Sequence, residues 1–141
     1  MPEGGDNLIL QVMDVVAQRR GRRIDPVILS VQNEIPLARG LGSSSTAILA
    51  GISCYELLSG DSLSDSDIFD CGMEFEAHSD NLAAGLLGGL TVSAISDSGR
   101  VMSSSLTVSD GITPVLVIPD FELSTQKARD VLPEGYSRRD A

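Results

Sequence analysis

The sequence predicts an α+β fold, and three observations support that prediction. Apolar residues recur at helical spacing over residues 7–20, and helix-forming stretches return after residue 43. Short runs typical of strands lie before and after these stretches, two of them joined by a turn signal. The chain has 141 residues, of which 42% are hydrophobic, so it is long enough to bury a core. Helices and strands mixed in this way indicate an α+β arrangement.

The first predicted element is a helix over residues 7–20, NLILQVMDVVAQRR. Leu8 and Val12 fall on one face, with further apolar residues beside them. Asp6 is the expected N-cap, and Gly21 is placed to end the helix.

A half-buried strand is predicted next, over residues 27–35, VILSVQNEI. Leu29 and Val31 would face one side of a sheet while polar residues face the other. Pro36 ends this strand, because proline cannot donate to a strand ladder.

Three further helices are predicted in the middle of the chain. The first covers residues 44–60, is rich in small residues and ends in glycine. The second covers residues 65–77, with Ser64 as its cap. The third is short, covers residues 80–87 and is broken by Gly88.

The sequence of the last third of the chain predicts three strands and the start of a helix. Residues 90–95 and 104–109 read as two strands separated by the turn signal SDSG at 96–99. Residues 113–119, TPVLVIP, read as a buried strand bounded by prolines. A final helix begins at Ser124, its expected cap.

Charge and composition exclude several classes of protein. The net charge is −10, so we expect no nucleic-acid partner. No stretch approaches the roughly 20 apolar residues that span a bilayer, so we expect no membrane partner. Cys54 and Cys71 lack metal-type spacing and are expected to be reduced thiols. The acidic start does not resemble a signal peptide, and we expect a cytoplasmic location.

The stretch IPLARGLGSSST, residues 35–46, admits two interpretations. A Gly/Ser run is typical of a linker or of a strand-to-helix turn with a serine cap. Alternatively, Gly40 and Gly42 followed by serines at a helix start fit a phosphate site, because glycine accepts positive φ and a helix N-terminus offers free N–H donors. The stretch is not a Walker loop, since it contains no lysine.

The string from Pro36 to Ser45, PLARGLGSSS, resembles the phosphate-binding motif P-x-x-x-G-L-G-S-S of the GHMP kinases. This family includes galactokinase, homoserine kinase, mevalonate kinase and phosphomevalonate kinase. Six positions match in register, which is more specific than a lone glycine pattern. The resemblance implies that ATP phosphates are held by Pro36, Gly40, Leu41, Gly42, Ser43, Ser44 and Ser45.

Two further motifs resemble the homoserine kinase branch of this family. Residues 74–93 are similar to E-G-H-x-D-N-x-A-x-x-x-x-G-G, with Ala77 in place of the usual glycine and Ser79 in place of a common proline. Residues 124–141 are similar to S-T-x-x-A-R-x-x-L-P-x-x-Y. Mevalonate and galactose kinases typically carry glycine and serine where His78 lies.

The resemblance implies ATP-dependent phosphorylation of the side-chain hydroxyl of L-homoserine to O-phospho-L-homoserine, a precursor of threonine. Ser44 and Glu76 would hold Mg²⁺, with Glu74 as the rival carboxylate. Arg129 would clamp the substrate carboxylate. The implied substrate contacts are His78, Asn81, Thr125 and Arg129, and the implied catalytic residues are Glu76, Asp80 and Asn81, with Asp80 as the candidate base.

The resemblance also implies a domain organisation. Residues 1–111 would form a partial N-terminal, ATP-binding domain of the ribosomal protein S5 domain 2-like type, and residues 112–141 would begin a ferredoxin-like C-terminal domain. A complete homoserine kinase is about twice as long, so we expect a central fragment whose exposed sheet edges favour a homodimer or another association. Two alternatives remain: a non-catalytic nucleotide- or partner-binding remnant, and another GHMP small-molecule kinase of the mevalonate or shikimate type.

Overall fold

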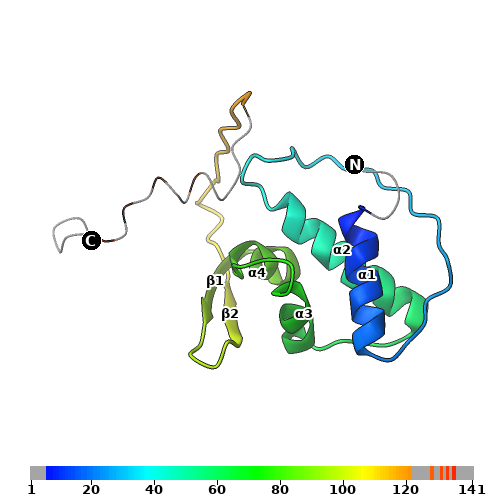
Figure 1. The fold of residues 1–141 in the computed structure, drawn as a ribbon. Coiled ribbons are helices and arrows are strands. Elements are labelled where there is room, and N and C mark those ends of the chain that lie inside the picture. The colour runs from blue at the N-terminus through cyan, green and yellow to red at the C-terminus, as the bar shows by residue number, and fades with distance from the viewer. Residues whose placement is uncertain (1–5, 122–127, 129–130, 132, 134, 136–141) are drawn as a thin grey trace.

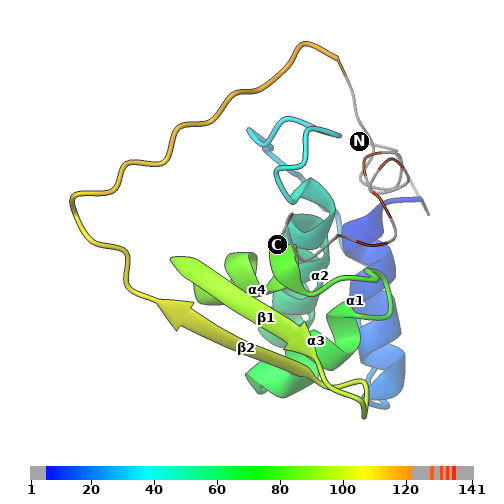
Figure 2. The ribbon, with the colours of Figure 1, turned by 90° about the vertical axis from the view of Figure 1, so that its left-hand side faces the viewer.

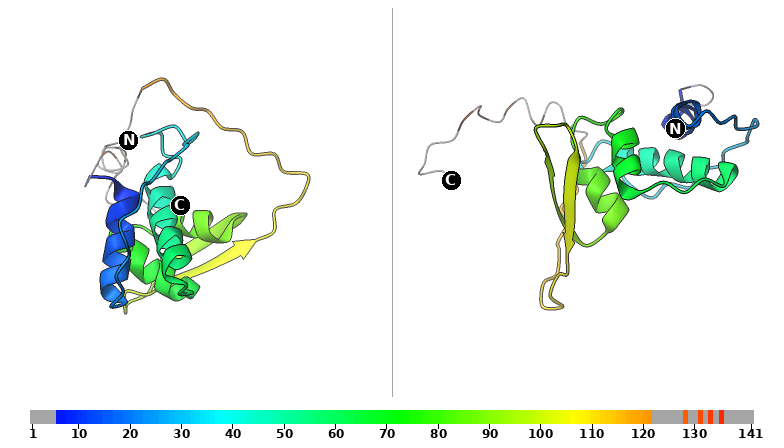
Figure 3. Two further views of the ribbon diagram at one scale, coloured as in Figure 1. Left: turned by 90° about the vertical axis from the view of Figure 1, so that its right-hand side faces the viewer. Right: turned by 90° about the horizontal axis from the view of Figure 1, so that it is seen from below.

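The structure is a computed structural model that describes residues 6–121, 128, 131, 133 and 135 (Figure 1). Its described elements, in chain order, are α1 (Leu8–Arg19), α2 (Ser43–Ser59), α3 (Asp65–Gly72), α4 (Asp80–Leu87), β1 (Leu90–Ile95) and β2 (Val101–Leu106). Helix α4 packs on the β1–β2 hairpin and on α2, and α2 packs on α1 (Figure 2). Seen from below, the hairpin and α1 lie at opposite sides, with the other helices between them (Figure 3). The α+β prediction is confirmed.

Helix α1 forms as predicted but begins with a different cap. The Asn7 side chain, not that of Asp6, accepts a hydrogen bond of 3.0 Å from the Ile9 N–H. Gly21 has a φ of 62° and ends the helix, and the Arg22 N–H then reaches the Ala17 carbonyl at 2.8 Å. The chain therefore leaves α1 in a tight left-handed turn.

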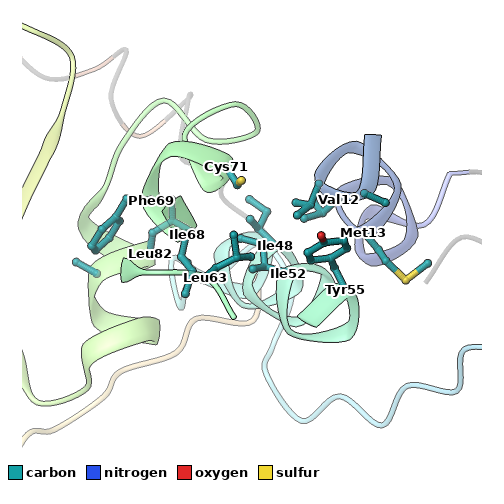
Figure 4. Packing of buried hydrophobic residues seen from close by; sticks show 13 residues of the cluster. Val12, Met13, Ile48, Ile52, Tyr55, Leu63, Ile68, Phe69, Cys71 and Leu82 are labelled. Atoms are coloured by element: carbon teal, nitrogen blue, oxygen red, sulfur yellow. The ribbon is translucent and has the colours of Figure 1, made fainter. Parts of the chain in front are cut away.

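Helix α2 lies close against α1 because Gly51 has no side chain. A Cβ built at Gly51 would lie 2.6 Å from the Ile9 carbonyl oxygen. Tyr55, Ile48 and Ile52 of α2 are each at most 1% exposed, and Figure 4 shows them meeting Val12 on one side. Figure 4 also shows Leu63, Ile68, Phe69, Cys71 and Leu82 completing the cluster.

Helix α3 has the predicted cap but is shorter than predicted. The Ser64 hydroxyl accepts from the Asp67 N–H at 3.2 Å, and the Asp67 carboxylate accepts in return from the Ser64 N–H at 3.1 Å. The helix ends at Gly72 rather than at residue 77, and residues 73–75 form a turn. A Cβ at Gly72 would lie 2.9 Å from the Leu82 side chain, so this glycine allows α3 to approach α4.

The two strands form an antiparallel hairpin around the predicted turn. Leu90 pairs with Leu106, and Ile95 pairs with Val101. The second strand therefore begins three residues earlier than the predicted 104–109, because the short turn fixes which residues lie opposite β1.

The prediction of strands over residues 27–35 and 113–119 is wrong for this structure. Neither segment forms a ladder, and the hairpin is the one sheet within the described residues. Their apolar side chains are largely open to solvent: Ile28 is 102% exposed and Val117 is 89% exposed. An alternating pattern favours a strand only where a partner strand is present, and no described segment pairs with either one.

Three other sequence predictions concern single features. Cys54 and Cys71 are both free thiols. None of the described helices is long and apolar enough to cross a membrane. The helix predicted to begin at Ser124 lies outside the described residues, and the boundary predicted at residue 111 stays a prediction.

Candidate functional site

The glycine-serine loop is a left-handed turn that opens directly into α2. Ala38, Gly40 and Gly42 have φ values of 53°, 70° and 71°. Gly42 is the N-cap of α2, and its carbonyl accepts from the Thr46 N–H at 2.9 Å and from the Thr46 hydroxyl at 3.0 Å. The first N–H groups of a helix have no intrahelical partner and attract anions. The loop therefore has the backbone form expected of a phosphate site rather than of a linker.

Glu76 reaches this helix start from the turn that follows α3. The Ser44 hydroxyl lies 3.2 Å and 3.0 Å from the two carboxylate oxygens of Glu76. The Ser45 hydroxyl donates to Glu76 Oε2 at 2.5 Å, and Ser45 itself is 1% exposed. The pair predicted to hold a cation, Ser44 and Glu76, is thus in direct contact.

Glu74, the rival carboxylate, points elsewhere. It forms an ion pair with Arg19 of α1. Arg19 also contacts the sulfur of Cys71 at 3.7 Å. Glu74 is therefore engaged with α1, whereas Glu76 is the carboxylate that contacts the glycine-serine loop.

A cavity of about 280 Å³ joins the loop to the residues around the start of α4. A Cβ at Gly42 would lie 3.3 Å from Asn81 Oδ1, so the absence of a side chain at this position lets the loop approach Asn81. The residues that line the cavity are Ala38, Gly40, Leu41, Gly42, Ser43, Ser44, Glu76, His78, Asp80 and Asn81. Three regions distant in sequence, namely the loop, the turn after α3 and the start of α4, therefore form one concave site.

Some residues predicted for the site lie outside this cavity. Pro36 is exposed and is not part of the lining. Ser45 is buried and is not part of the lining, but its hydroxyl donates to Glu76, which is. Thr125 and Arg129 lie outside the described residues.

A second cavity of about 270 Å³ adjoins the first. It is lined by His78, Ser79, Asp80, Ser93, Ala94 and Ile95, so His78 and Asp80 line both cavities. Asp80 also accepts a hydrogen bond of 2.7 Å from the Asn81 N–H.

Sequence reasoning missed the contact that holds the start of α4 on the β1–β2 hairpin. Ser79 is 5% exposed, and its hydroxyl donates to the Ser93 hydroxyl of β1 at 3.0 Å. Ser79 is the N-cap of α4, yet its side chain makes no capping hydrogen bond. The alternation of β1 could have indicated Ser93 as inward-facing, but no local pattern links it to Ser79.

The described residues hold no cluster of three or more histidine, cysteine, aspartate or glutamate side chains that could bind a metal ion. Mg²⁺ does not require such a cluster, because it is commonly held by one or two carboxylates together with substrate phosphates. The oxygen atoms of Glu76 and Ser44, beside a helix start suited to phosphate, fit that donor set.

Comparison with known proteins identifies the family of this chain. The sequence model of the GHMP kinases N-terminal domain matches residues 7–89, more than half of the chain. The chain belongs to the GHMP kinase family. The matched residues include the phosphate loop, Glu76, His78, Asp80 and Asn81.

The relatives of this GHMP kinase chain include homoserine kinases. That of Persephonella marina is 42% identical over 135 residues, which cover 96% of this chain and 45% of the relative. That of Deinococcus radiodurans is 40% identical, covering 95% of this chain and 43% of the relative. A solved structure of a candidate homoserine kinase from Listeria monocytogenes has a TM-score of 0.68 at 29% identity, covering 92% of this chain and 46% of the other. The chain spans a little under half the length of these relatives.

Proposed function

We propose that this chain carries the nucleotide-binding centre of a homoserine kinase, which transfers the γ-phosphoryl group of ATP to the side-chain hydroxyl of L-homoserine. The single observation that carries the proposal is the contact of Glu76 with Ser44 and Ser45, at the mouth of a cavity formed by the glycine loop. The similarity to homoserine kinases over most of the chain supports the choice of acceptor.

The phosphate chain of ATP would lie along the loop. Backbone N–H groups of residues 40–45 would face the phosphate oxygens, and the dipole of α2 would favour their negative charge. Ser44 and Glu76 would hold Mg²⁺, which neutralises charge on the phosphates when bound. Ser45 would keep the Glu76 carboxylate turned toward the loop.

The acceptor alcohol would lie beside His78 and Asp80, which line both cavities. Its oxygen forms a bond to the γ-phosphorus while the bond from that phosphorus to the ADP oxygen breaks. The hydroxyl proton would pass to the Asp80 carboxylate or to an oxygen of the transferred phosphoryl group, since phosphoryl transfer depends mainly on positioning and charge. Asn81, beside Gly42, would orient the acceptor relative to the loop.

The product, O-phospho-L-homoserine, would place the enzyme in threonine biosynthesis. The predicted substrate contacts of Thr125 and Arg129 are part of this proposal and rest on sequence resemblance.

A non-catalytic remnant is the second candidate. Apolar side chains such as those of Val115 and Val117 are 82% and 89% exposed. Exposed apolar surface of this kind favours association with another polypeptide. A remnant would bind nucleotide or a partner without transferring phosphate.

One experiment separates these candidates. The purified chain is incubated with ATP, Mg²⁺ and one alcohol at a time: L-homoserine, L-serine, mevalonate or shikimate. ADP release that depends on L-homoserine supports the proposal, whereas release with mevalonate or shikimate supports another GHMP kinase. Calorimetric binding of ATP without ADP release from any alcohol supports the remnant, and absence of both binding and release contradicts a nucleotide site.

A further inference from the structure

Arg39 is the one arginine or lysine in the centre of this acidic chain. No other lysine or arginine occurs between Arg23 and Arg100. The cavity beside the loop is lined by two carboxylates, those of Glu76 and Asp80, and by no lysine or arginine. The Mg²⁺ proposed at Ser44 and Glu76 would offset the charge of these two carboxylates, so a further cation would be needed to meet the negative charge of a polyphosphate.

Arg39 lies within the phosphate loop and is held by an unusual contact. Its Nη2 donates to the backbone carbonyl of Asp120 at 3.2 Å, a residue 81 positions further along the chain. Figure 1 shows the segment after β2 rising from the hairpin toward the loop that precedes α2. The neighbours of Arg39 on either side, Ala38 and Gly40, both line the cavity.

The guanidinium of Arg39 is not neutralised within the described part of the chain. Its Nη1 is buried and has no hydrogen-bond partner there. No described carboxylate forms an ion pair with it, whereas Arg19, Arg20 and Arg22 each have one. A buried donor or charge without a partner is costly, and an anion arriving close by would offset that cost.

We propose that Arg39 makes the loop selective for polyphosphates, because its guanidinium adds a fixed positive charge to that of the Mg²⁺ proposed at Ser44 and Glu76, while the Asp120 carbonyl accepts a hydrogen bond from the guanidinium. This inference rests on the proposed function and adds a determinant of nucleotide affinity to it. Arg39 acts through its charge, so its effect grows with the number of phosphates on the ligand and is screened by salt.

The test compares Arg39→Gln, Arg39→Lys and wild type in calorimetric titrations with ATP, ADP and AMP. Glutamine keeps an N–H donor but removes the charge, and lysine keeps the charge. Arg100→Gln is the matched control, since it removes the same charge from the hairpin turn, which lies far from the loop in Figure 1. Circular dichroism confirms that each variant is folded.

We expect Arg39→Gln to weaken ATP binding roughly tenfold, ADP binding less and AMP binding little. Arg39→Lys is expected to lose less than Arg39→Gln, and raising the salt concentration should reduce the wild-type preference for ATP over AMP. An equal loss for all three nucleotides, or the same loss in the lysine variant, would assign Arg39 to anchoring alone and overturn the inference.

The salt dependence of the wild-type chain tests the inference even without a folded variant. An ATP-to-AMP affinity ratio that does not change with salt contradicts it. If Arg39→Gln binds ATP as tightly as the wild type does, this inference alone is overturned. If the wild-type chain binds none of the three nucleotides, the proposed function is overturned as well.

Discussion

The hydroxyl of Ser45 donates to Glu76 Oε2 across 2.5 Å, and this contact joins the first turn of α2 to the turn that follows α3. Ser45 is 1% exposed, so one contact of the carboxylate is with a buried hydroxyl. The other is with Ser44, which lines the cavity. The serine run therefore does more than begin a helix. It fixes the orientation of the carboxylate proposed to hold Mg²⁺.

Replacing Glu76 by glutamine should abolish the dependence of ATP binding on Mg²⁺. The amide keeps the shape of the side chain and an acceptor for Ser45 but removes the charge that a divalent cation requires. We expect any homoserine-dependent ADP release to fall by about 100-fold, the scale seen when one electrostatic stabiliser is removed. Calorimetric titrations with ATP, in Mg²⁺ and in a chelator, measure the effect on binding.

Glu74→Gln is the matched control for that variant. Glu74 pairs with Arg19 on α1, so its loss should leave the Mg²⁺ dependence unchanged and reduce stability by at most about 1 kcal/mol. If Glu74→Gln removes the Mg²⁺ dependence while Glu76→Gln keeps it, the assignment of the two carboxylates is reversed.

Sequence alone could predict the parts of this structure that depend on local chemistry. Gly40 and Gly42 were expected to accept positive φ, and both do so, although the glycines alone left both a linker and a phosphate site open. The Ser64 cap and the turn at 96–99 follow from side-chain chemistry within a few residues. Such features form wherever the local segment is placed, so a single stretch is sufficient to predict them.

Features that need a distant partner were not predictable in this way. The ion pair of Glu74 depends on Arg19, which lies on another helix, whereas the sequence favoured Glu76 only from its place directly before the His-x-Asp-Asn string. Residues 27–35 have the alternation of a strand, but a ladder requires a second strand that the described residues do not provide. The Ser79–Ser93 contact likewise depends on how α4 packs on the hairpin.

Gly42 should be less tolerant of alanine than Gly40. Both have φ near 70°, so each substitution should destabilise the fold by about 1–2 kcal/mol through backbone strain. At Gly42 the added Cβ would also press on Asn81, 3.3 Å from its Oδ1, whereas nothing lies within 4 Å of a Cβ at Gly40. Urea unfolding measures the loss of stability from backbone strain that both variants share. ATP affinity measures the additional effect of the contact with Asn81 in the Gly42 variant. Equal nucleotide affinities in the two variants would contradict a functional contact between the loop and Asn81.

Acid should remove the stabilisation that Asp61 provides. Asp61 accepts from Arg22 Nη2 at 2.7 Å and also from the buried Tyr55 hydroxyl. The hydrogen bond from Arg22, followed by that from Tyr55, lowers the pKa of Asp61 below its usual value. Because the pKa is lower in the folded state than in the unfolded state, the carboxylate stabilises the fold above about pH 4, and this contribution is lost as pH falls through the folded-state pKa.

We therefore expect Asp61→Asn to be less stable than wild type at pH 7, with the difference shrinking below about pH 4. Urea unfolding at a series of pH values gives the free energies. Tyr55→Phe keeps the Arg22 contact and should retain most of the pH dependence. If the difference in the free energy of unfolding between wild type and Asp61→Asn stays constant down to pH 2, the ionised carboxylate is not the source of that difference.

The hydrogen bond between Ser79 and Ser93 should couple the start of α4 to the hairpin. Both hydroxyls are removed in a double-mutant cycle of Ser79→Ala, Ser93→Ala and the double variant. We expect a coupling free energy of about 0.5–1.5 kcal/mol in urea unfolding, because Ser79 is 5% exposed and a single substitution leaves its partner unsatisfied. Ser79 lies between His78 and Asp80, so each single variant should also weaken binding of the acceptor alcohol more than binding of ATP.

The exposed hydroxyl pair of Ser96 and Ser98 supplies the control cycle. Their oxygens are also 3.0 Å apart, but water can replace either one, so the coupling should be close to zero. Equal coupling in the two cycles would mean that burial of Ser79 adds nothing. If the Ser79 and Ser93 variants lose as much affinity for ATP as for the acceptor alcohol, the Ser79–Ser93 hydrogen bond stabilises the fold without positioning His78 and Asp80.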